Sequence, residues 1–598
     1  MICSDKIIIG EKNMIGKIVS IKDGIIYVDL VVNIYDMQNI IGQNVTFDDR
    51  FIGEIGSMSA TMLEVNLVGE IVNGKFITGN TVMPRFGATC RLTTKEEIDV
   101  IYGVSAGADI IRIGKSYVYN DYQVCLNVNS FFSNHFAILG NSGSGKSYFV
   151  SRLLQGIFYD ARRVPINTNI LLFDAFGEYQ TAFNNINQVN SSLNYRVFTS
   201  DLKDNNYEKI LIPFWFLSVD DLCLLLDVDD TRQIPILEKA LKLVGYFCKN
   251  TDGNMINQKN DIIYRSFFDI IFSGVNHIEV RNKIVTVLSK FSTNDINLEV
   301  NLTKGGWTRS IRQCIAIDEQ GKFADIEIVV SYLEQFCQNV FELTLPDGTF
   351  MYSIKDFYTA LEFALISEGV FSSNKVFDYA NVLKVRLNTL INSDYVHYFD
   401  CTNYISKKDF ITYLFYKSSN QKCQVVNFNI SHVDDRFAKA IVKIYSKIFF
   451  DYVTELPNRG SIPYHIILEE AHRYVQEDID TKIIGYNIFD RIAKEGRKYG
   501  ILLGLITQRP SEISGTTISQ CSNFAVFKMF NRVDINYVND IVPGISDMTM
   551  SKIKTLTPGN CMLFGTAFKM PTLTSVDLPN PTPNSDSCNI NATWYQGT

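Results

Sequence analysis

Residues 140–147 have the types and spacing of a phosphate-binding loop. They follow the apolar run 136–139 and precede an amphipathic segment that begins near Tyr148. Glycines at these spacings let backbone N–H groups surround a polyphosphate, while Lys146 reaches the outer phosphates and the Ser147 hydroxyl binds Mg²⁺. The sequence therefore predicts a site for ATP and Mg²⁺ and predicts ATP hydrolysis. The predicted nucleotide-binding residues are Gly140, Asn141, Ser142, Gly143, Ser144, Gly145, Lys146 and Ser147.

A second acidic element is needed because Mg²⁺ takes carboxylate ligands and the attacking water needs a base. The apolar run 466–468 ends in Glu469 and Glu470. We assign Glu469 to the metal, through water, and Glu470 to polarising the water that attacks the γ-phosphate. Aspartate is the usual residue at the first of these positions. The alternative interpretation is a strand that runs into a solvated helix start, where glutamate is also common.

Gln508 follows the buried run 500–506 and is the predicted sensor of the γ-phosphate. A polar amide at the tip of a central strand can hydrogen-bond the attacking water and report hydrolysis to the rest of the domain. A solvent-facing loop glutamine is the alternative. Arg497 lies in a cluster of cations before the same strand. It either complements a helix C-terminus or reaches the γ-phosphate of a neighbouring subunit as an arginine finger.

Short apolar strands alternate with helical patterns from about residue 130, which indicates an α/β fold with a parallel sheet covered by helices. The apolar spacing becomes mostly helical between about 218 and 415, and we interpret this region as an insertion in the ATPase. The predicted strands are 135–139, 170–174, 424–430, 464–469, 500–507, 523–530 and 560–565.

The first hundred residues are rich in strand patterns and contain a hairpin signal at Asp23-Gly24. They predict a small β-barrel. The expected domains are the barrel at 1–100, the ATPase core at 101–217 and 416–580, the helical insertion at 218–415, and a polar tail with few anchors at 581–598.

Composition narrows the class of protein. The chain has 598 residues, 46% of them hydrophobic, but no apolar run approaches the about 18 residues that a membrane span needs. Twelve cysteines are scattered without a CxxC pair and are accompanied by six histidines, which favours reduced thiols over a zinc site or disulfides. We therefore expect a cytoplasmic protein without a membrane partner. A net charge of -8 argues against a wholly basic surface but leaves room for a basic channel.

Six motifs together resemble the HerA-type ATPases of the HerA/FtsK superfamily, over nearly the whole chain. Where the family has Asp-Pro-His-Gly-Glu-Tyr, this chain has Ala175 and Phe176, so the roles of Asp174 and Glu178 stay open. The motifs are 135–140 leading into the phosphate loop, Asp174-Ala175-Phe176-Gly177-Glu178-Tyr179, Ile212-Pro213-Phe214-Trp215, Leu468-Glu469-Glu470-Ala471-His472, Glu495-Gly496-Arg497-Lys498 and Thr507-Gln508-Arg509-Pro510.

The resemblance implies a RecA-like P-loop ATPase core with an N-terminal barrel of the HerA–ATP-synthase (HAS) type and a helical insertion. It also implies a homohexameric ring that moves duplex DNA through its pore, with Arg497 acting between subunits. A separate effector protein, either a nuclease or a sirtuin-like NADase, is the implied partner, in antiphage defence or DNA end processing. The alternative is a ring that scaffolds and regulates this effector without processive translocation. A small-molecule NTPase such as a kinase is a further class, but the ring-motor residues Gln508 and Arg497 argue against it.

Overall fold

The computed structural model describes residues 14–22, 24–32, 40–79, 82–103, 109–119, 122–159, 163–248, 253–272, 276–338, 342–368, 374–477, 479–542, 547–585, 590 and 594. The chain divides into two compact units. Unit 1 comprises Met1–Glu208, Tyr413–Glu477 and Ile488–Thr598, and unit 2 comprises Lys209–Thr412 and Asp478–Asn487. Unit 2 begins nine residues before the limit of 217/218 expected for the helical insertion, ends three residues before 415/416, and also includes 478–487, which we expected in the core.

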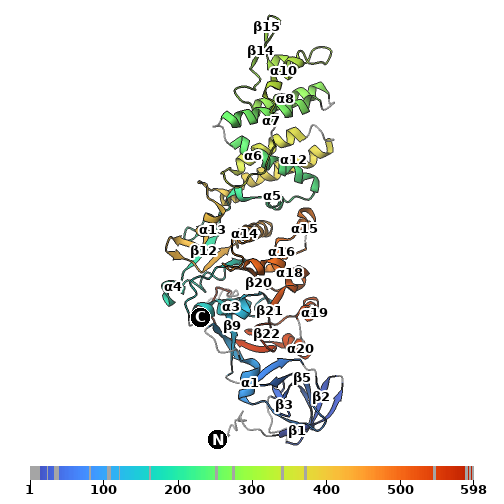
Figure 1. Ribbon diagram of the computed structural model, residues 1–598, viewed down its shortest axis with the longest axis vertical. Helices are drawn as coiled ribbons and strands as arrows, with labels where there is room; N and C mark the ends of the chain where they lie inside the picture. Colours follow the sequence, from blue (N-terminus) through green and yellow to red (C-terminus); the bar gives the residue numbers. More distant parts are fainter. Residues whose placement is uncertain are drawn as a thin grey trace. The chain divides into compact units, whose positions relative to one another are not determined.

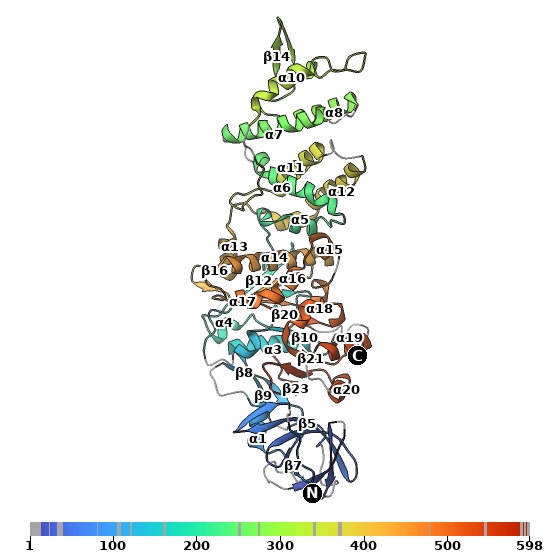
Figure 2. The same ribbon diagram turned by 45° about the vertical axis from the view of Figure 1, so that its right-hand side comes forward.

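The N-terminal strands form a closed barrel, as predicted (Figure 2, dark blue). Six strands close the ring in the order β2-β1-β7-β3-β4-β5, because β2 also pairs with β5, and β6 extends from β5. Buried apolar side chains such as Val28, Val45 and Val65 fill the interior. The strands are β1 (Met14–Lys22), β2 (Ile25–Leu30), β3 (Asn44–Phe47), β4 (Phe51–Met58), β5 (Met62–Val72), β6 (Lys75–Thr78) and β7 (Thr89–Leu92).

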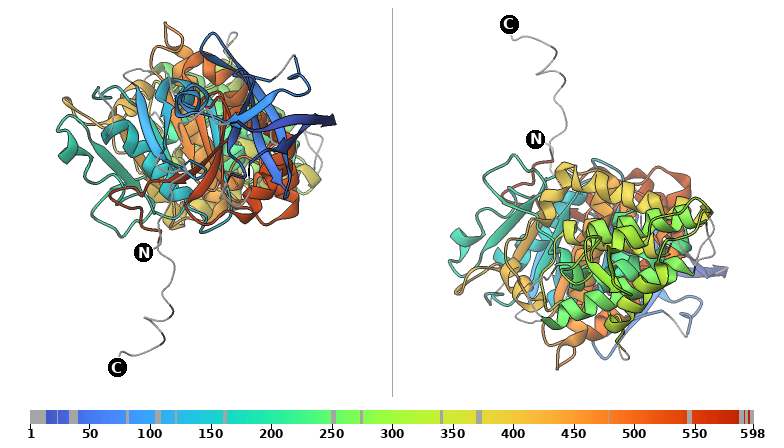
Figure 3. Two further views of the ribbon diagram at one scale, coloured as in Figure 1. Left: turned by 90° about the horizontal axis from the view of Figure 1, so that it is seen from below. Right: turned by 90° about the horizontal axis from the view of Figure 1, so that it is seen from above.

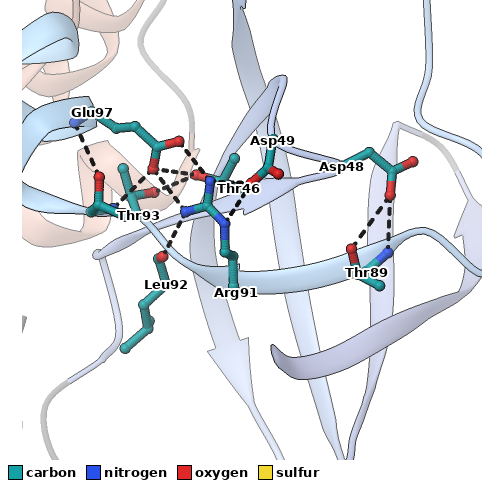
Figure 4. A network of polar contacts seen from close by, with 9 residues as sticks. Thr46, Asp48, Asp49, Thr89, Arg91, Leu92, Thr93 and Glu97 are labelled. Atoms are coloured by element: carbon teal, nitrogen blue, oxygen red, sulfur yellow. Dashed lines mark hydrogen bonds and ion pairs between the residues drawn. The ribbon is translucent and has the colours of Figure 1, made fainter. Parts of the chain in front are cut away.

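A buried charge network fastens the helix α1 (Lys95–Tyr102) to the barrel (Figure 4). The Arg91 guanidinium, 7% exposed, donates to Asp49 at 2.5 Å and to Glu97 at 2.7 Å. Glu97 also accepts from the Thr94 amide, which forms the capping box of α1. Burial raises the pKa of Glu97, but its hydrogen bonds to Arg91 and Thr94 outweigh this effect and lower the pKa overall. The start of α1 is thus held by charge as well as by its cap.

Polar contacts also join the barrel to the ATPase core within unit 1. Asn44 in β3 is 1% exposed and accepts hydrogen bonds of 2.7 Å from the hydroxyls of Tyr102 and Tyr119. Glu54 in β4 accepts from Lys552 at 2.7 Å. Because Asn44 is buried and satisfied by residues outside the barrel, this contact specifies one arrangement of barrel and core.

The ATPase core is built on one twelve-stranded sheet in the order β13-β12-β18-β11-β19-β20-β10-β21-β22-β23-β8-β9 (Figure 1). The strands from β12 to β21 run parallel, and the remaining pairings from β21 to β9 are antiparallel. The strands are β8 (Ile110–Ser116), β9 (Gln123–Asn127), β10 (His135–Leu139), β11 (Ile170–Asp174), β12 (Tyr195–Thr199), β13 (Glu208–Lys209), β18 (Val425–Asn429), β19 (Tyr464–Leu468), β20 (Ile501–Thr507), β21 (Cys521–Val526), β22 (Asn560–Gly565) and β23 (Thr572–Val576).

All seven strands predicted from the sequence form, and the bounds 135–139, 170–174 and 560–565 are those predicted. The prediction of a strand over 523–530 was wrong at its end, since β21 stops at Val526. Beyond Val526 the backbone is irregular but still contacts the phosphate loop, because the Lys528 carbonyl accepts a hydrogen bond from the Asn141 N–H at 3.0 Å.

Helices cover both faces of the sheet (Figure 2). Val425 of β18 belongs to the core beneath α3, whereas Phe428 packs on Tyr445 of α14 at 4.7 Å between ring centroids. Residues three apart on a strand face opposite sides, so α3 and α14 lie on opposite faces. The helices are α2 (Val128–Phe132), α3 (Lys146–Tyr159), α4 (Ile186–Val189), α14 (Asp435–Glu455), α16 (Ile488–Arg491), α17 (Arg497–Tyr499), α18 (Gly515–Ser519), α19 (Arg532–Ile541) and α20 (Asp547–Thr555).

Unit 2 is mostly helical, as predicted for the insertion (Figure 3, right view, green and yellow). Leu222, Leu237 and Leu241, whose spacing predicted helices, are buried. Its elements are α5 (Val219–Leu225), α6 (Ile234–Cys248), α7 (Gly253–Ile271), α8 (His277–Lys290), the hairpin β14 (Asn301–Lys304) and β15 (Trp307–Ser310), α9 (Ile311–Cys314), α10 (Ile326–Leu333), α11 (Ile354–Glu368), α12 (Asn374–Ile391) and α15 (Ile479–Ile484).

Two further elements lie near the limits of unit 2: α13 (Lys407–Phe415) extends into unit 1 and is followed there by the hairpin β16 (Tyr416–Ser418) and β17 (Gln421–Lys422). Within the described parts of the chain, no helix combines the length and apolar character needed to cross a membrane.

Candidate nucleotide-binding site

The phosphate loop connects β10 to α3 at the C-terminal edge of the parallel strands. Gly140 packs so closely on Phe527 that an added Cβ would lie 2.5 Å from the Cβ of Phe527. Gly145 has a φ of 109°, which favours glycine. The Lys146 side chain is 8% exposed, and its Nζ donates to the Asn141 carbonyl at 3.0 Å. The lysine is therefore held within the loop that its sequence motif predicts.

Glu469 and Glu470 follow β19 and face the same cavity as Lys146 and Ser147. One Glu469 oxygen accepts from the Ala175 N–H at 3.0 Å. Glu470 is 7% exposed and has a φ of 49° and a ψ of 47°. A left-handed conformation of a non-glycine residue costs roughly 1–2 kcal/mol and persists where the surrounding structure enforces it. Here the enforced turn directs Glu470 to the cavity.

The surroundings of the Glu470 carboxyl leave part of its hydrogen-bonding capacity unused. The backbone of Gln508, the residue that follows β20, lies beside this carboxyl and lowers its pKa, although burial raises the pKa overall. Oε2 of Glu470 is buried and accepts no hydrogen bond from the described residues, although Nδ1 of His472 lies 3.2 Å away. Burial lowers the pKa of His472, so this imidazole is neutral near pH 7. A carboxylate oxygen with a spare lone pair is what a general base requires.

Asp174 holds the loop that follows β11. It is fully buried at the end of β11, and its carboxylate accepts from the amides of Gly177, Glu178 and Tyr179 at 2.7, 3.0 and 3.0 Å. Three backbone donors on one carboxylate fix the 174–179 loop beside the phosphate loop. Glu178, whose role the sequence left open, lines the cavity itself.

The cavity contains more acidic than basic side chains. Burial raises the pKa values of Glu178, Glu469 and Glu470, and the charge of Asp174 raises that of Glu469 further. Burial lowers the pKa of Lys146, although the surrounding glutamates oppose that shift. One buried cation thus faces several buried carboxyls, and added positive charge would be favourable there.

The structure brings Gln508 next to this site and leaves Arg497 far from it. Gln508 lines a separate hollow of 360 Å³ that it shares with Asn141 of the phosphate loop. Arg497 is exposed and precedes the start of β20, near His135 at the start of β10. The cavity lies beyond the other ends of these strands, about 20 Å away for a strand of this length. Arg497 therefore does not reach the cavity of its own chain.

The comparisons with known proteins agree with this arrangement. Residues 111–301 match the family model described as the central domain of helicase HerA. Over these residues the chain is similar to HerA-type ATPases.

The DNA double-strand break repair helicase HerA of Sulfolobus acidocaldarius is 23% identical over 583 residues, which cover 96% of this chain and 90% of that protein. HerA of Sulfurisphaera tokodaii is 23% identical over 83% of this chain and 74% of that protein. Among solved structures, VirB4 of Thermoanaerobacter pseudethanolicus has 10% identity and a TM-score of 0.40, covering 79% of this chain and 98% of that one.

The donor set of this site suits Mg²⁺. Among the described residues, no group of three or more His, Cys, Asp or Glu could hold a metal by itself. Mg²⁺ in nucleotide sites takes only one or two protein ligands and completes its shell with water and phosphate oxygens. Ser147 and Glu469, which line the same cavity, provide such a pair.

Several cavity-lining residues were missed by the sequence reasoning. The cavity has a volume of about 720 Å³, and residues beyond β23 form part of its wall. We expected 581–598 to be a tail with few anchors, but its described part is held by hydrogen bonds at Pro581, Thr582 and Asn584. The missed lining residues include Tyr148, Phe176, Pro558, Val576, Asp577, Leu578, Asn584 and Ser585.

Proposed function

We propose that this chain is an ATP-driven motor that moves duplex DNA. The observation that carries the proposal is the convergence of Lys146, Glu469 and Glu470 on one cavity at the edge of a parallel sheet. Relatives named DNA double-strand break repair helicase HerA match this chain over most of its length, which supports DNA as the substrate that is moved.

In the proposed chemistry, the phosphate-loop amides and Lys146 hold the β- and γ-phosphates. Glu470 orients the attacking water and accepts its proton on the oxygen that has no hydrogen bond. Ser147 binds Mg²⁺ directly and Glu469 does so through water, and the ion neutralises charge on the phosphates. The raised pKa of Glu470 makes it a better proton acceptor than an exposed glutamate.

Gln508 is the proposed sensor. Its backbone lies beside the carboxyl of Glu470, and Gln508 lines the same hollow as Asn141 of the phosphate loop. A change at the γ-phosphate can therefore pass through Glu470 or the loop to the end of β20. This position supports a sensor better than it supports a solvent-facing loop residue.

The place of Arg497 supports a closed ring. An arginine at the far edge of the sheet contributes to hydrolysis only if a neighbouring copy presents its nucleotide there, and head-to-tail contacts of this kind close into rings. A homohexamer is the proposed assembly. Its partner would be a separate effector, a nuclease or a sirtuin-like NADase, in antiphage defence or DNA end processing in the cytoplasm.

The test combines assembly and substrate dependence. Light scattering or electron microscopy of the purified chain should give a ring of six subunits, and duplex DNA should change its ATPase rate. A stable monomer whose ATPase ignores DNA would contradict the proposal. A ring whose ATPase responds to a purified effector but not to DNA would instead favour the scaffold alternative.

A further inference from the structure

The residues after β23 form part of the nucleotide cavity. Residues 577–585, here called the strap, run beyond Val576, and Asp577, Leu578, Asn584 and Ser585 line the cavity that also contains Lys146. Prolines at 579, 581 and 583 restrict the backbone of the strap. A segment with fewer unfolded conformations costs less to order than a flexible tail.

Gln155 in α3 holds the centre of the strap. This side chain is 1% exposed, and its Nε2 donates to the carbonyls of Pro581 at 2.8 Å and Ala182 at 2.9 Å. Its Oε1 accepts from the Asn580 amide at 2.9 Å. When the oxygen and the nitrogen of a buried side-chain amide both hydrogen-bond to main-chain groups, they hold that main chain in one position. Since α3 begins with Lys146, the strap and the phosphate loop are attached to the same helix.

Further contacts hold both ends of the strap against elements of the site. They are the ion pair of Asp577 with Arg112 at 2.8 Å, the hydrogen bond from Thr181 to the Thr582 carbonyl at 2.9 Å, and the bond from the Asn584 amide to the Glu178 carbonyl at 2.7 Å. The strap is therefore a built wall of the cavity.

Part of the cavity wall is apolar, and folding does not explain this character. Leu578 is 78% exposed and Phe176 is 57% exposed, yet both line the cavity. Large apolar side chains left in water at a pocket gain free energy when a flat apolar ligand covers them. The phosphate loop and the glutamates occupy the polar part, so the apolar part is available to the nucleoside.

We propose that the strap binds the nucleoside half of ATP, with Leu578 packed on the face of the base. Gln155 is a positioning residue that holds Leu578 in place through the main chain of Asn580 and Pro581. This assignment rests on the ATPase activity and is independent of whether the chain moves DNA.

The experiment separates nucleoside binding from phosphate binding. In Leu578→Ala, the KM for ATP should rise about tenfold, because a leucine contact with the base is lost, while kcat stays near the parent value. Inhibition by inorganic tripolyphosphate, which has no base, should not change. Leu345→Ala, at a leucine of unit 2 that is 47% exposed, is the matched control and should leave both values unchanged.

Gln155→Leu tests the positioning role with a side chain of similar size. It should raise the KM for ATP and leave inhibition by tripolyphosphate unchanged. An unaltered KM for ATP in Leu578→Ala would overturn the proposal that Leu578 packs on the base of the nucleotide. Equal weakening of ATP and tripolyphosphate in Gln155→Leu would overturn the positioning role, since it would mean that the phosphate loop itself was damaged.

Discussion

The backbone of Gln508, just after β20, lies beside the carboxyl of Glu470, just after β19, and lowers its pKa. These strands are neighbours in the parallel sheet, and β10 with its phosphate loop is the next strand. A movement of Glu470 between nucleotide states would therefore be felt at the backbone of Gln508. The proposed coupling of hydrolysis to motion begins at this contact.

The first prediction separates nucleotide binding from hydrolysis. Glu470→Gln keeps the size of the side chain but removes the proton acceptor, so it should bind ATP normally and lose hydrolysis by a factor of about 10² or more. Lys146→Ala removes the charge that holds the phosphates and should abolish binding or turnover. Binding of a fluorescent ATP analogue and phosphate release measure the two steps. Equal hydrolysis rates in Glu470→Gln and the parent would rule out Glu470 as the base.

The second prediction concerns Arg497. Arg497→Ala should retain ATP affinity and lose about 10³-fold or more in turnover, because its guanidinium acts on the transition state of a neighbour. Neither Arg497→Ala nor Glu470→Gln should be active alone, but mixing the two should restore part of the activity at interfaces that pair an intact Arg497 with an intact Glu470. Lys498→Ala, at the adjacent exposed cation, is the control. Full turnover by monomers of the parent would contradict the role in trans.

The third prediction concerns the attachment of α1 to the barrel. Arg91→Met should lower the free energy of unfolding by about 3 kcal/mol, because it leaves Glu97 without its buried partner. Arg312→Met is the control at an ion pair with Glu299 in which both side chains are more than half exposed, and it should cost less than about 1 kcal/mol. Urea denaturation of the full chain measures both values. Similar losses in the two variants would show that burial of the Arg91 network adds nothing.

The fourth prediction is a pH dependence of stability. Burial lowers the pKa of His135 to about 4, whereas the unfolded chain takes up this proton near pH 6.5. Between pH 4 and pH 6.5 the unfolded state binds more protons than the folded state. The free energy of unfolding should therefore fall by about 3 kcal/mol as the pH decreases from 6.5 to 4.

His135→Asn is the matching variant, because Asn can still accept the hydrogen bond that Nδ1 of His135 receives from the Leu503 amide at 2.9 Å. It should lose less stability than the parent over the same pH range in urea denaturation. Parallel pH curves for the two proteins would refute the assignment to His135.

The sequence predicted those features that depend on local pattern. Continuous apolar runs revealed β10, β11 and β22 with their bounds, and the phosphate loop followed from its spacing. The strands β8 and β9 were missed because they are only partly buried. Buried and more exposed residues alternate along them, as is common in antiparallel strands near the edge of a sheet.

The strap was missed for a different reason. Its sequence is polar and rich in proline, which is also typical of a tail, and its order depends on Gln155, more than 400 residues away along the chain. The proximity of the Gln508 backbone to Glu470 could not be predicted either, because it depends on the pairing of β19 with β20. Long-range contacts of this kind are set by topology and leave no periodic signal in the sequence.

The central claim is that hydrolysis at this site moves duplex DNA, and displacement of a third strand from a DNA triplex tests it most directly. The parent protein with ATP should release the labelled third strand at a rate that depends on the length of the adjoining duplex, and Glu470→Gln should release none. Release should also weaken steeply with salt, since duplex DNA would be held by its phosphates. Rapid DNA-stimulated hydrolysis by the parent with no strand release would contradict the account.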